Sequence, residues 1–290
     1  MSVRERDPVT GYETTGHVWN GIKELNTHVP RAVWFFIIVT HLYALVAWVL
    51  LPTWPLGETY TKGLLGADQR ERLETQVANA QASRAVWTDR ITAEPLDAIR
   101  ADADLMRAVE ATAPALFGDN CEACHGANAE GGPGYPSLVD SAWLWGGDDE
   151  TVMETLRVGI NSPHPDTRIA QMLAFGRDGI LSRDEIRTVS AYVLSLSGGE
   201  ITEDAREEGA TLFVDNCESC HGEDAKGLTD VGAPDLTDDF WIYGKSDEAL
   251  FRTIHGGRYG WMPAWEDRLT LAERKMLAIH IRNLAEGAAR

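Results

Sequence analysis

All four cysteines of the chain lie in two copies of one short motif, Cys-x-x-Cys-His, at residues 121–125 and 217–221. Such a motif is typical of covalent attachment of haem c, in which both cysteine sulfurs form thioether bonds and the histidine binds the iron. A redox-active cysteine pair would leave the histidine unexplained, and a structural zinc ion would need two more ligands for each pair. We therefore predict two covalently bound haems c and a function in electron transfer. The residues expected to hold the two haems covalently are Cys121, Cys124, Cys217 and Cys220.

The histidines of the motifs, His125 and His221, are the expected proximal iron ligands. At such sites the second ring nitrogen usually donates a hydrogen bond that fixes the ring. Pro136 and Pro234 follow the motifs at positions that resemble those in cytochromes c, where a proline carbonyl often accepts this bond. The resemblance therefore implies that these two carbonyls orient the two imidazoles.

The sixth ligand of each iron is expected to be a methionine, because methionine with histidine gives a relatively high potential that suits electron transfer. Met262 lies in a loop before the last predicted helix and is the candidate in the second domain, and Met172 is its equivalent in the first. Leu173 stands where a proline commonly follows such a methionine. The alternatives are two methionines expected to lie in packed helices and two histidines in nearby segments: Met153, Met276, His164 and His255.

The chain contains an internal duplication, because the two motifs start 96 residues apart within matching surroundings. Leu-Phe-x-Asp-Asn precedes both motifs, and a tryptophan-containing segment follows each, at residues 142–146 and 240–244. Each copy ends in a predicted helix that opens with a capping box, at Ser182 and at Thr270. We predict two consecutive cytochrome c-like domains, 111–198 and 199–290, each running from a helix through the haem motif and loops to its own C-terminal helix.

Residues 32–51 form an uncharged stretch of 20 residues, which is long enough to cross the hydrocarbon core of a membrane as a helix. Arg4, Arg6, Lys23 and Arg31 precede it, whereas the first basic residue after it is Lys62. The positive-inside rule then predicts a cytoplasmic N-terminal segment, 1–31, and haem domains in the periplasm, with the chain anchored once in the lipid of the bacterial inner membrane. His41 lies in the middle of the span and is a functional candidate or a neutral contact with a neighbouring helix.

Residues 52–110 separate the span from the first haem domain and form a predicted helical linker. Charged residues and alanines dominate this region, and two helices broken near residues 92–95 are expected. The sequence leaves two roles open, a spacer and a docking surface for another subunit.

The formal net charge of −19 excludes a role in binding nucleic acid, which needs a basic surface. It is compatible with docking of basic redox partners, because complementary fields raise encounter rates. It is equally compatible with a purely solubilising role of the charge.

With these features combined, the chain resembles the dihaem subunit of cbb3-type cytochrome c oxidase, usually called subunit III, over nearly its whole length. The most diagnostic segment is 16–26, Gly-His-Val-Trp-Asn-Gly-Ile-Lys-Glu-Leu-Asn, in which Asn20 replaces the usual aspartate. The resemblance implies an all-α fold with one N-terminal transmembrane helix and two tandem cytochrome c-like haem domains. It also implies that the chain accepts electrons from a cytochrome c and passes them towards a monohaem subunit and a catalytic subunit, where the oxygen chemistry takes place.

Two other functions compete with this interpretation. A membrane-anchored dihaem cytochrome c could serve a periplasmic dehydrogenase or another respiratory complex, but a generic anchor would not need the segment before the span. A dihaem peroxidase would need an open or weakly ligated iron, which two methionine ligands disfavour.

Overall fold

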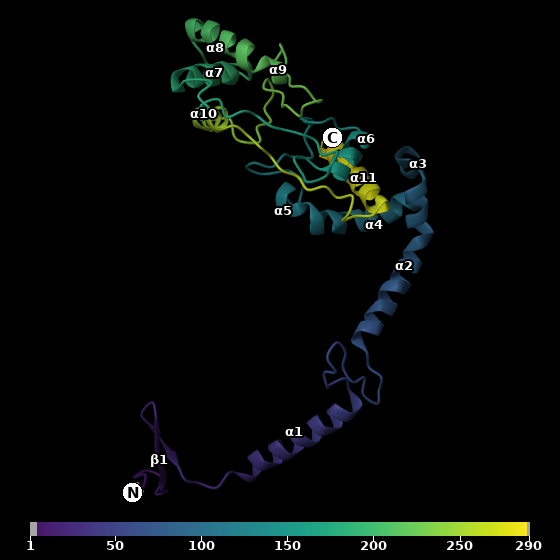
Figure 1. Ribbon diagram of the computed structural model, residues 1–290, viewed down its shortest axis with the longest axis vertical. Coiled ribbons are helices and arrows are strands. Elements are labelled where there is room, and N and C mark those ends of the chain that lie inside the picture. The colour runs from purple at the N-terminus through teal and green to yellow at the C-terminus, as the bar shows by residue number, and fades with distance from the viewer. Residues whose placement is uncertain (1–4, 289–290) are drawn as a thin grey trace. The chain divides into compact units, whose positions relative to one another are not determined.

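The computed structural model describes residues 5–288 of the chain. The predicted N-terminal segment, 1–31, and the second predicted domain, 199–290, each extend beyond this range. Arg4 lies outside it. Internal contacts divide the chain into two compact units, Met1–Ala82 and Ser83–Arg290. The elements are almost all helical, which confirms the predicted fold class; one short hairpin is the exception (Figure 1).

The hairpin lies in the segment that precedes the membrane span. Strands β1 (Thr14–Trp19) and β2 (Ile22–Leu25) pair antiparallel, with Trp19 opposite Ile22. The two residues between them, Asn20 and Gly21, have φ values of 49° and 86°. Two positive φ values are what a tight two-residue hairpin turn requires, and Asn-Gly and Asp-Gly both suit it. The departure from aspartate at residue 20 is therefore structurally mild.

Helix α1 (Arg31–Leu50) corresponds to the predicted span, shifted by one residue. Of the helices within residues 5–288, it alone is long and apolar enough to cross a membrane, and none of its residues is buried by protein. The Nδ1 atom of His41 lies 2.7 Å from the carbonyl oxygen of Ile37, so the helix itself supplies a partner for this side chain. Trp48, near the end of the helix, makes an edge-on contact with Trp54, with ring centroids 5.3 Å apart.

The predicted linker is helical and breaks where the sequence indicates. Helix α2 (Gln69–Ala93) ends before Pro95, and the short helix α3 (Leu96–Ala101) follows. The last turn of α2 and α3 bury Ile91, Leu96 and Ile99 in one cluster with residues of the next helix. The end of the linker thus belongs to the hydrophobic core of the second unit and is more than a spacer.

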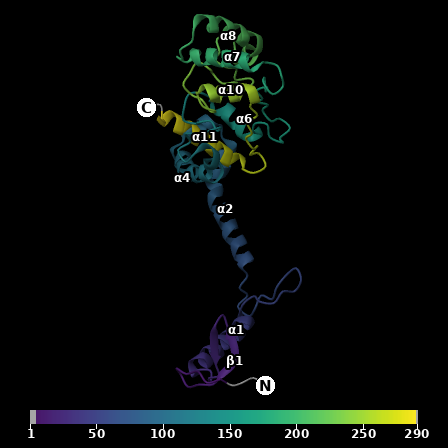
Figure 2. The same cartoon turned by 90° about the vertical axis from the view of Figure 1, so that its left-hand side faces the viewer.

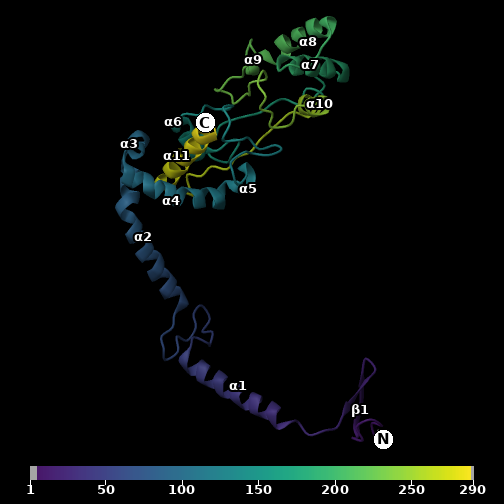
Figure 3. The ribbon, with the colours of Figure 1, turned by 180° about the vertical axis from the view of Figure 1, so that it is seen from behind.

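The remaining helices of the second unit form two packed groups. They are α4 (Ala103–Asn120), α5 (Glu122–His125), α6 (Asp149–Val158), α7 (Arg183–Leu196), α8 (Glu203–Asn216), α9 (Glu218–His221), α10 (Asp247–Gly256) and α11 (Leu271–Ala288). Helix α11 packs against α3, α4 and α6, and we call this group, α3–α6 with α11, lobe 1. Helix α7 packs against α8 and α10, and we call the group α7–α10 lobe 2. The same grouping is visible from three directions (Figures 1, 2 and 3).

The position of α11 in lobe 1 rests on its apolar face. Met276, Leu277 and Ile279 are at most 1% exposed, and their neighbours include Val109 and Phe117 of α4. Burial of one such side chain contributes roughly 1.5–3 kcal/mol. Three of them contribute about as much as the whole net stability of a marginal domain. Helix α11 is therefore held in lobe 1 by a core contact and not by surface contacts alone.

The contact between α7 and α8 is equally close. A methyl group added at Gly209 of α8 would come within 2.5 Å of Tyr192 Cβ in α7, so only glycine allows this approach. Tyr192 also contacts Phe213, with ring centroids 5.7 Å apart. The helix that ends the first sequence repeat thus packs on the helix that begins the second.

The packing differs from the expectation that each terminal helix closes its own repeat, since α7 lies in lobe 2 and α11 in lobe 1. The physical reason is visible in the chain path. Only residues 197–202 join α7 to α8, and a connection this short favours antiparallel neighbours. The chain crosses from lobe 1 to lobe 2 after α6 and returns after α10. Lobe 2 is therefore one continuous stretch, whereas lobe 1 is assembled from two.

Candidate haem sites

The two Cys-x-x-Cys-His motifs occupy the same structural position in the two lobes. Each follows a long helix, α4 or α8, and forms a four-residue helix of its own, α5 or α9. A buried phenylalanine, Phe117 or Phe213, lies four residues before the first cysteine and accepts a backbone hydrogen bond of 2.7 Å from it. The preceding helix and its core contact thus fix the orientation of each motif.

Both motif histidines are held in the same way, as predicted. His125 Nδ1 lies 3.0 Å from the carbonyl oxygen of Pro136, and His221 Nδ1 lies 3.0 Å from that of Pro234. This contact directs Nε2 away from the loop and leaves it available for an iron ion. Burial lowers the pKa of both imidazoles, although the proline carbonyls oppose the shift. The rings are therefore neutral at physiological pH, which is the form that binds a metal.

The proline carbonyls depend on two glycines in the same loops. Gly131 and Gly227 have φ values of 74° and 77°, in the region that favours glycine. A Cβ atom at Gly227 would lie 2.2 Å from Ala233 O and 2.7 Å from Pro234 O. A side chain here would displace the carbonyl that holds His221.

The cysteines of each motif differ in exposure. Cys121 is buried and Cys217 half-buried, whereas Cys124 and Cys220 are exposed. Burial, with the neighbouring thiol, raises the pKa of Cys121 and of Cys217 to about 11. Within residues 5–288 no group of three or more His, Cys, Asp or Glu side chains is placed to hold a metal ion, so neither cysteine pair has the further ligands that a structural zinc needs.

Each candidate methionine lies in the lobe that holds the haem motif of the other repeat. Met262 packs against the cluster around Phe117 and Cys121, next to the first motif. Met172 packs against the cluster around Phe213, and Cys217 of the second motif lies against the same cluster. The structure thus brings each methionine to the motif of the other repeat.

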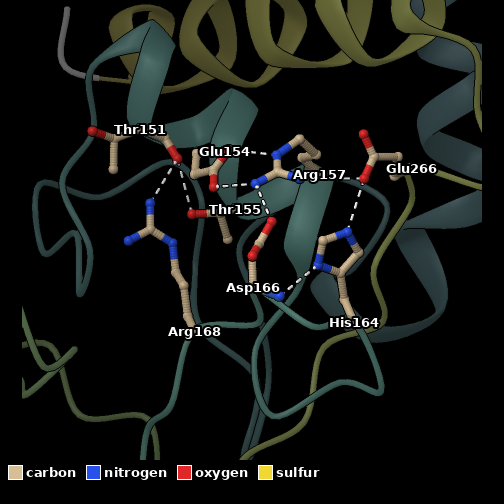
Figure 4. A network of polar contacts seen from close by, with 8 residues as sticks. All are labelled: Thr151, Glu154, Thr155, Arg157, His164, Asp166, Arg168 and Glu266. Atoms are coloured by element: carbon tan, nitrogen blue, oxygen red, sulfur yellow. Dashed lines mark hydrogen bonds and ion pairs between the residues drawn. The ribbon is translucent and has the colours of Figure 1, made fainter.

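The rival ligands have other contacts. Met276 is 1% exposed in the core of lobe 1, as expected, and Met153 packs against the two clusters of the same lobe. His164 Nε2 lies 2.8 Å from Glu266 Oε2, and its Nδ1 accepts a 3.0 Å hydrogen bond from the backbone of Asp166 (Figure 4). Both ring nitrogens of His164 are therefore engaged. The ring of His255 stacks on Phe251 at 5.5 Å.

Two cation–aromatic pairs near the sites were not predicted. The guanidinium of Arg168 lies 4.8 Å from the ring centroid of Trp145, and that of Arg258 lies 4.0 Å from the ring of Tyr243. The pairs are equivalent in the repeat, because each arginine stands four residues before a candidate methionine. That repeated Arg-x-x-x-Met spacing is the signal that could have identified them.

The first of these pairs also tests whether the site suits a haem. Within the described part of the chain, Trp145 Nε1 and Arg168 Nε are buried donors without a hydrogen-bond partner. Buried donors of this kind normally have an acceptor. The carboxylates of haem propionates would supply one. The donors therefore fit a haem c, as do the thiols and neutral imidazoles of the motifs.

A cavity of about 1190 Å³ borders both motif loops. Equivalent residues of the two repeats line it, among them Pro136 and Pro234 as well as Trp143 and Trp241. Several carboxylates lie at its wall, including Asp140, Asp235, Asp238 and Asp239. The loops that orient the two imidazoles thus share one open, acidic space.

Two attachment motifs with half-buried neutral imidazoles, each next to a candidate thioether ligand, define a cytochrome c with two haems. Comparisons with known proteins agree. Residues 111–197 match a family model described as cytochrome c, and residues 204–281 match one described as cytochrome c oxidase, cbb3-type, subunit III. Residues 11–58 match the N-terminal domain of cytochrome oxidase-cbb3, FixP.

Full-length relatives give the same result. The chain is 42% identical to a cbb3-type cytochrome c oxidase subunit CcoP from Azospirillum sp. (strain B510), over 99% of this chain and 100% of the relative. It is 44% identical to a subunit FixP from Bradyrhizobium sp. (strain ORS 278), over 98% of each chain. It is 39% identical to a subunit CcoP from Cereibacter sphaeroides, over 94% of this chain and 95% of the relative.

The chain therefore belongs to the CcoP/FixP family of cbb3-type cytochrome c oxidase subunits. It carries two haems c and serves electron transfer as a subunit of that oxidase, so other oxidase subunits are its partners. The alternative, a cytochrome that serves a periplasmic dehydrogenase, is not favoured. The single apolar helix α1 is consistent with anchoring to a membrane.

Proposed function

We propose that this chain accepts electrons from a cytochrome c and passes them through its own two haems to the monohaem subunit, and from there to the catalytic subunit, where oxygen is reduced. The observation that carries this proposal is the presence of two equivalent histidine sites within one packed unit, Ser83–Arg290. Two metal sites beside one cavity suit a relay, because both can exchange electrons with a partner that docks there.

The proposal includes the iron ligands. His125 and His221 bind the two irons on the proximal side, and Met172 and Met262 bind them on the distal side. The cysteine pairs of the two motifs hold the haem edges through thioether bonds. A histidine–methionine pair raises the reduction potential of a haem c, which suits a chain that receives electrons from another cytochrome c.

The proposal also includes an orientation. The N-terminal segment lies in the cytoplasm, α1 crosses the lipid of the bacterial inner membrane once, and the haem lobes lie in the periplasm. The basic residues Arg6, Lys23 and Arg31 before the span and their absence until Lys62 support it. Protease added to intact spheroplasts should digest the haem lobes and spare the hairpin. Digestion of the hairpin alone would contradict this orientation.

The acidic wall of the cavity supports docking of a basic donor. Asp238 lies among Asp140, Asp235 and Asp239, and burial together with these neighbouring carboxylates raises its pKa. A basic partner would relieve this repulsion, and its encounter rate would fall with added salt.

Stopped-flow mixing of the purified oxidase with a reduced, basic cytochrome c tests the donor site. Asp238→Asn with Asp239→Asn should slow the second-order reduction several-fold at low salt and weaken its salt dependence. Glu208→Gln together with Asp204→Asn on α8 removes the same charge away from the cavity and should leave the rate unchanged. Equal slowing by both double variants would show that only net charge matters.

The relay itself has a separate test. In an oxidase whose chain lacks both cysteine pairs, the donor should no longer reduce the catalytic subunit at the normal rate. Normal reduction in that complex would refute the relay.

A further inference from the structure

We propose that Trp145, which belongs to the first repeat, is a positioning residue for the haem of the second motif. Its indole holds the loop whose Pro234 carbonyl orients His221. The proposal rests on the histidine ligands of the proposed function, and it adds a side chain that controls one of them from the other repeat. Tyr243, the equivalent of Trp145 in the second repeat, has the reciprocal position at the loop of the first motif.

The first support is the contact between Trp145 and the second of the two loops that carry the prolines. We call residues 131–136 proline loop 1 and residues 227–234 proline loop 2. Gly232 of proline loop 2 has a φ of 65°, and a Cβ atom there would lie within 2.8 Å of three atoms of the Trp145 indole. Any side chain at this position would move the ring or the loop. The ring edge therefore lies directly against the backbone, two residues before Pro234.

The loop can transmit a displacement at Gly232 to the histidine. The carbonyl oxygen of Pro234 lies 3.0 Å from His221 Nδ1, and only Ala233 separates this proline from the glycine. At the start of the loop, Gly227 donates a 2.8 Å backbone hydrogen bond to His221 O. Both ends of proline loop 2 are thus tied to the histidine, so movement of the glycine moves the carbonyl that orients the ring.

Trp145 is itself fixed on lobe 1. The guanidinium of Arg168 lies 4.8 Å from its ring centroid, and Arg168 Nη2 donates a 3.3 Å hydrogen bond to the carbonyl oxygen of Thr151 in α6 (Figure 4). The backbone carbonyl of Arg168 also accepts a 2.8 Å hydrogen bond from Asn161. The indole therefore reaches from a helix of lobe 1 to proline loop 2.

The second repeat makes the same kind of bridge in the opposite direction. Arg258 lies 4.0 Å from the ring of Tyr243 and donates hydrogen bonds of 3.1 and 2.6 Å to Thr253 Oγ1 in α10. Gly134, the equivalent of Gly232 in proline loop 1, donates a 2.9 Å hydrogen bond to Ile242 O. A Cβ atom at Gly134 would lie 3.8 Å from Tyr243 Cε1. The contact thus occurs at equivalent residues of both repeats, and it follows from the way in which the repeats pack.

The two bridges differ in how much the aromatic ring contributes. At proline loop 1 the ring of Tyr243 is in ordinary van der Waals contact, and the backbone bond between Gly134 and Ile242 does not depend on it. At proline loop 2 the indole of Trp145 is pressed against the loop backbone. Removal of the indole should therefore disturb its loop more than removal of the tyrosine ring disturbs the other.

A displaced proline carbonyl should change the reduction potential of the iron. The hydrogen bond to the second ring nitrogen raises the basicity of the ligating nitrogen, which favours ferric iron. A weaker hydrogen bond to His221 should therefore raise the potential of the haem at Cys217. The haem at Cys121, although it belongs to the same repeat as Trp145, should keep its potential.

The test is a redox titration of the full-length chain with both haems, followed at the α-band of ferrous haem c. Gly227→Ala assigns the two midpoints, because an added Cβ atom there would lie 2.7 Å from Pro234 O and would act on proline loop 2 directly. Trp145→Leu should raise the midpoint that Gly227→Ala changes and leave the other midpoint unchanged. Tyr243→Leu should change the other midpoint, by a smaller amount.

Two further tryptophans supply matched controls. Trp143 precedes Trp145 by two positions but packs against the cluster that contains Cys121, so Trp143→Leu should change only the midpoint of the haem at Cys121. Trp87 packs against the cluster at the end of the linker, and Trp87→Leu should lower stability and leave both midpoints in place.

Trp145→Phe separates packing from hydrogen bonding. Phenylalanine keeps a ring against Gly232 but lacks the Nε1 donor of the indole, so this variant should recover most of the midpoint shift of Trp145→Leu. An equal shift in both variants would assign the effect to the donor and would overturn the positioning role. The phenylalanine variant also keeps the aromatic packing, in case the leucine variant fails to fold.

The proposal would be overturned if Trp145→Leu changed only the haem at Cys121, both haems equally, or neither. The relay of the proposed function would survive each of these results, since it is judged by reduction of the catalytic subunit. Where two midpoints overlap, the chain with Cys121→Ala and Cys124→Ala retains only the haem at Cys217. Its single midpoint should rise in Trp145→Leu and stay in Trp143→Leu, and the reverse would refute the proposal.

Discussion

The substitution Gly159→Ala should weaken the binding of the proposed distal ligand Met262 to its iron, although the two residues lie more than 100 positions apart in sequence. Gly159 adopts φ 67° and ψ −169°, a region that glycine alone adopts readily. Alanine in that conformation costs about 1–3 kcal/mol. The added methyl group would also overlap the backbone of residues 262–264 at 2.5–2.7 Å. The simplest relief is movement of the methionine segment away from lobe 1.

This strain corresponds to a measurable loss in the affinity of the Met262 sulfur for its iron. Since about 1.4 kcal/mol is a factor of ten, the methionine should compete roughly 5- to 140-fold less well for its iron. Imidazole displaces methionine from ferric haem c, and the displacement is followed by loss of the near-infrared charge-transfer band of ferric haem with a methionine ligand. In Gly159→Ala the imidazole titration should split into two phases, with one midpoint lowered by that factor and the other unchanged. Since Met262 packs against the cluster that contains Cys121, the lowered midpoint should belong to the haem at Cys121.

Gly179→Ala is the matched control for backbone strain. Gly179 also has a positive φ, of 70°, but no atom lies within 4 Å of an added Cβ. This variant should lose some stability and keep both imidazole midpoints. If Gly159→Ala behaved like Gly179→Ala, the contact with Met262 would not contribute to ligation and the reasoning would be wrong.

Three further predictions concern stability and the histidine sites. Ser182→Ala and Thr270→Ala each remove a capping box, and each should lower the free energy of urea unfolding by about 1 kcal/mol. The first variant should destabilise lobe 2 and the second lobe 1. Destabilisation of the same lobe by both variants would contradict the exchange of helices. The imidazole of His164 and the guanidinium of Arg157 lower the pKa of Glu266. The stabilising effect of the Glu266 carboxylate is therefore present at neutral pH and disappears as pH falls through that lowered pKa. Glu266→Gln should show a smaller loss of urea resistance between pH 7 and pH 4 than the native chain. Gly227→Ala should shift the carbonyl that holds His221 and change the reduction potential of one haem only, as measured by a redox titration; two altered potentials would indicate a global disturbance.

Much of this architecture could be predicted from local sequence signals. The motif of residues 121–125 specifies haem attachment because thioether formation needs that spacing, and the span 32–51 is recognisable by length and lack of charge alone. The capping boxes at Ser182 and Thr270 mark where two helices begin, and the structure has both. The proline carbonyls were also found at the expected histidine nitrogens.

The exchange of the terminal helices was not predicted, because the two repeats carry nearly the same local signals. The apolar faces of α7 and α11 could each pack on α4 or α8, so periodicity does not distinguish the partners. The only sequence signal was a length: six residues between α7 and α8 hold these helices together as a hairpin. The Asn20–Gly21 turn was likewise present in the sequence as a hairpin signal. The predicted boundary between residues 198 and 199 divides the sequence repeats and stays a prediction. It does not coincide with the division into lobes.

The discontinuous build of lobe 1 sets an order of events during biosynthesis. A ribosome releases the chain from its N-terminus, and early segments normally fold first. Here the stretch from Met172 to Arg258 can complete its own core as soon as it has emerged. The core around Cys121 stays open until α11, the last helix made, has docked. The first cysteine motif to be synthesised is thus the last to be enclosed, which leaves the machinery that attaches haem the longest access to it.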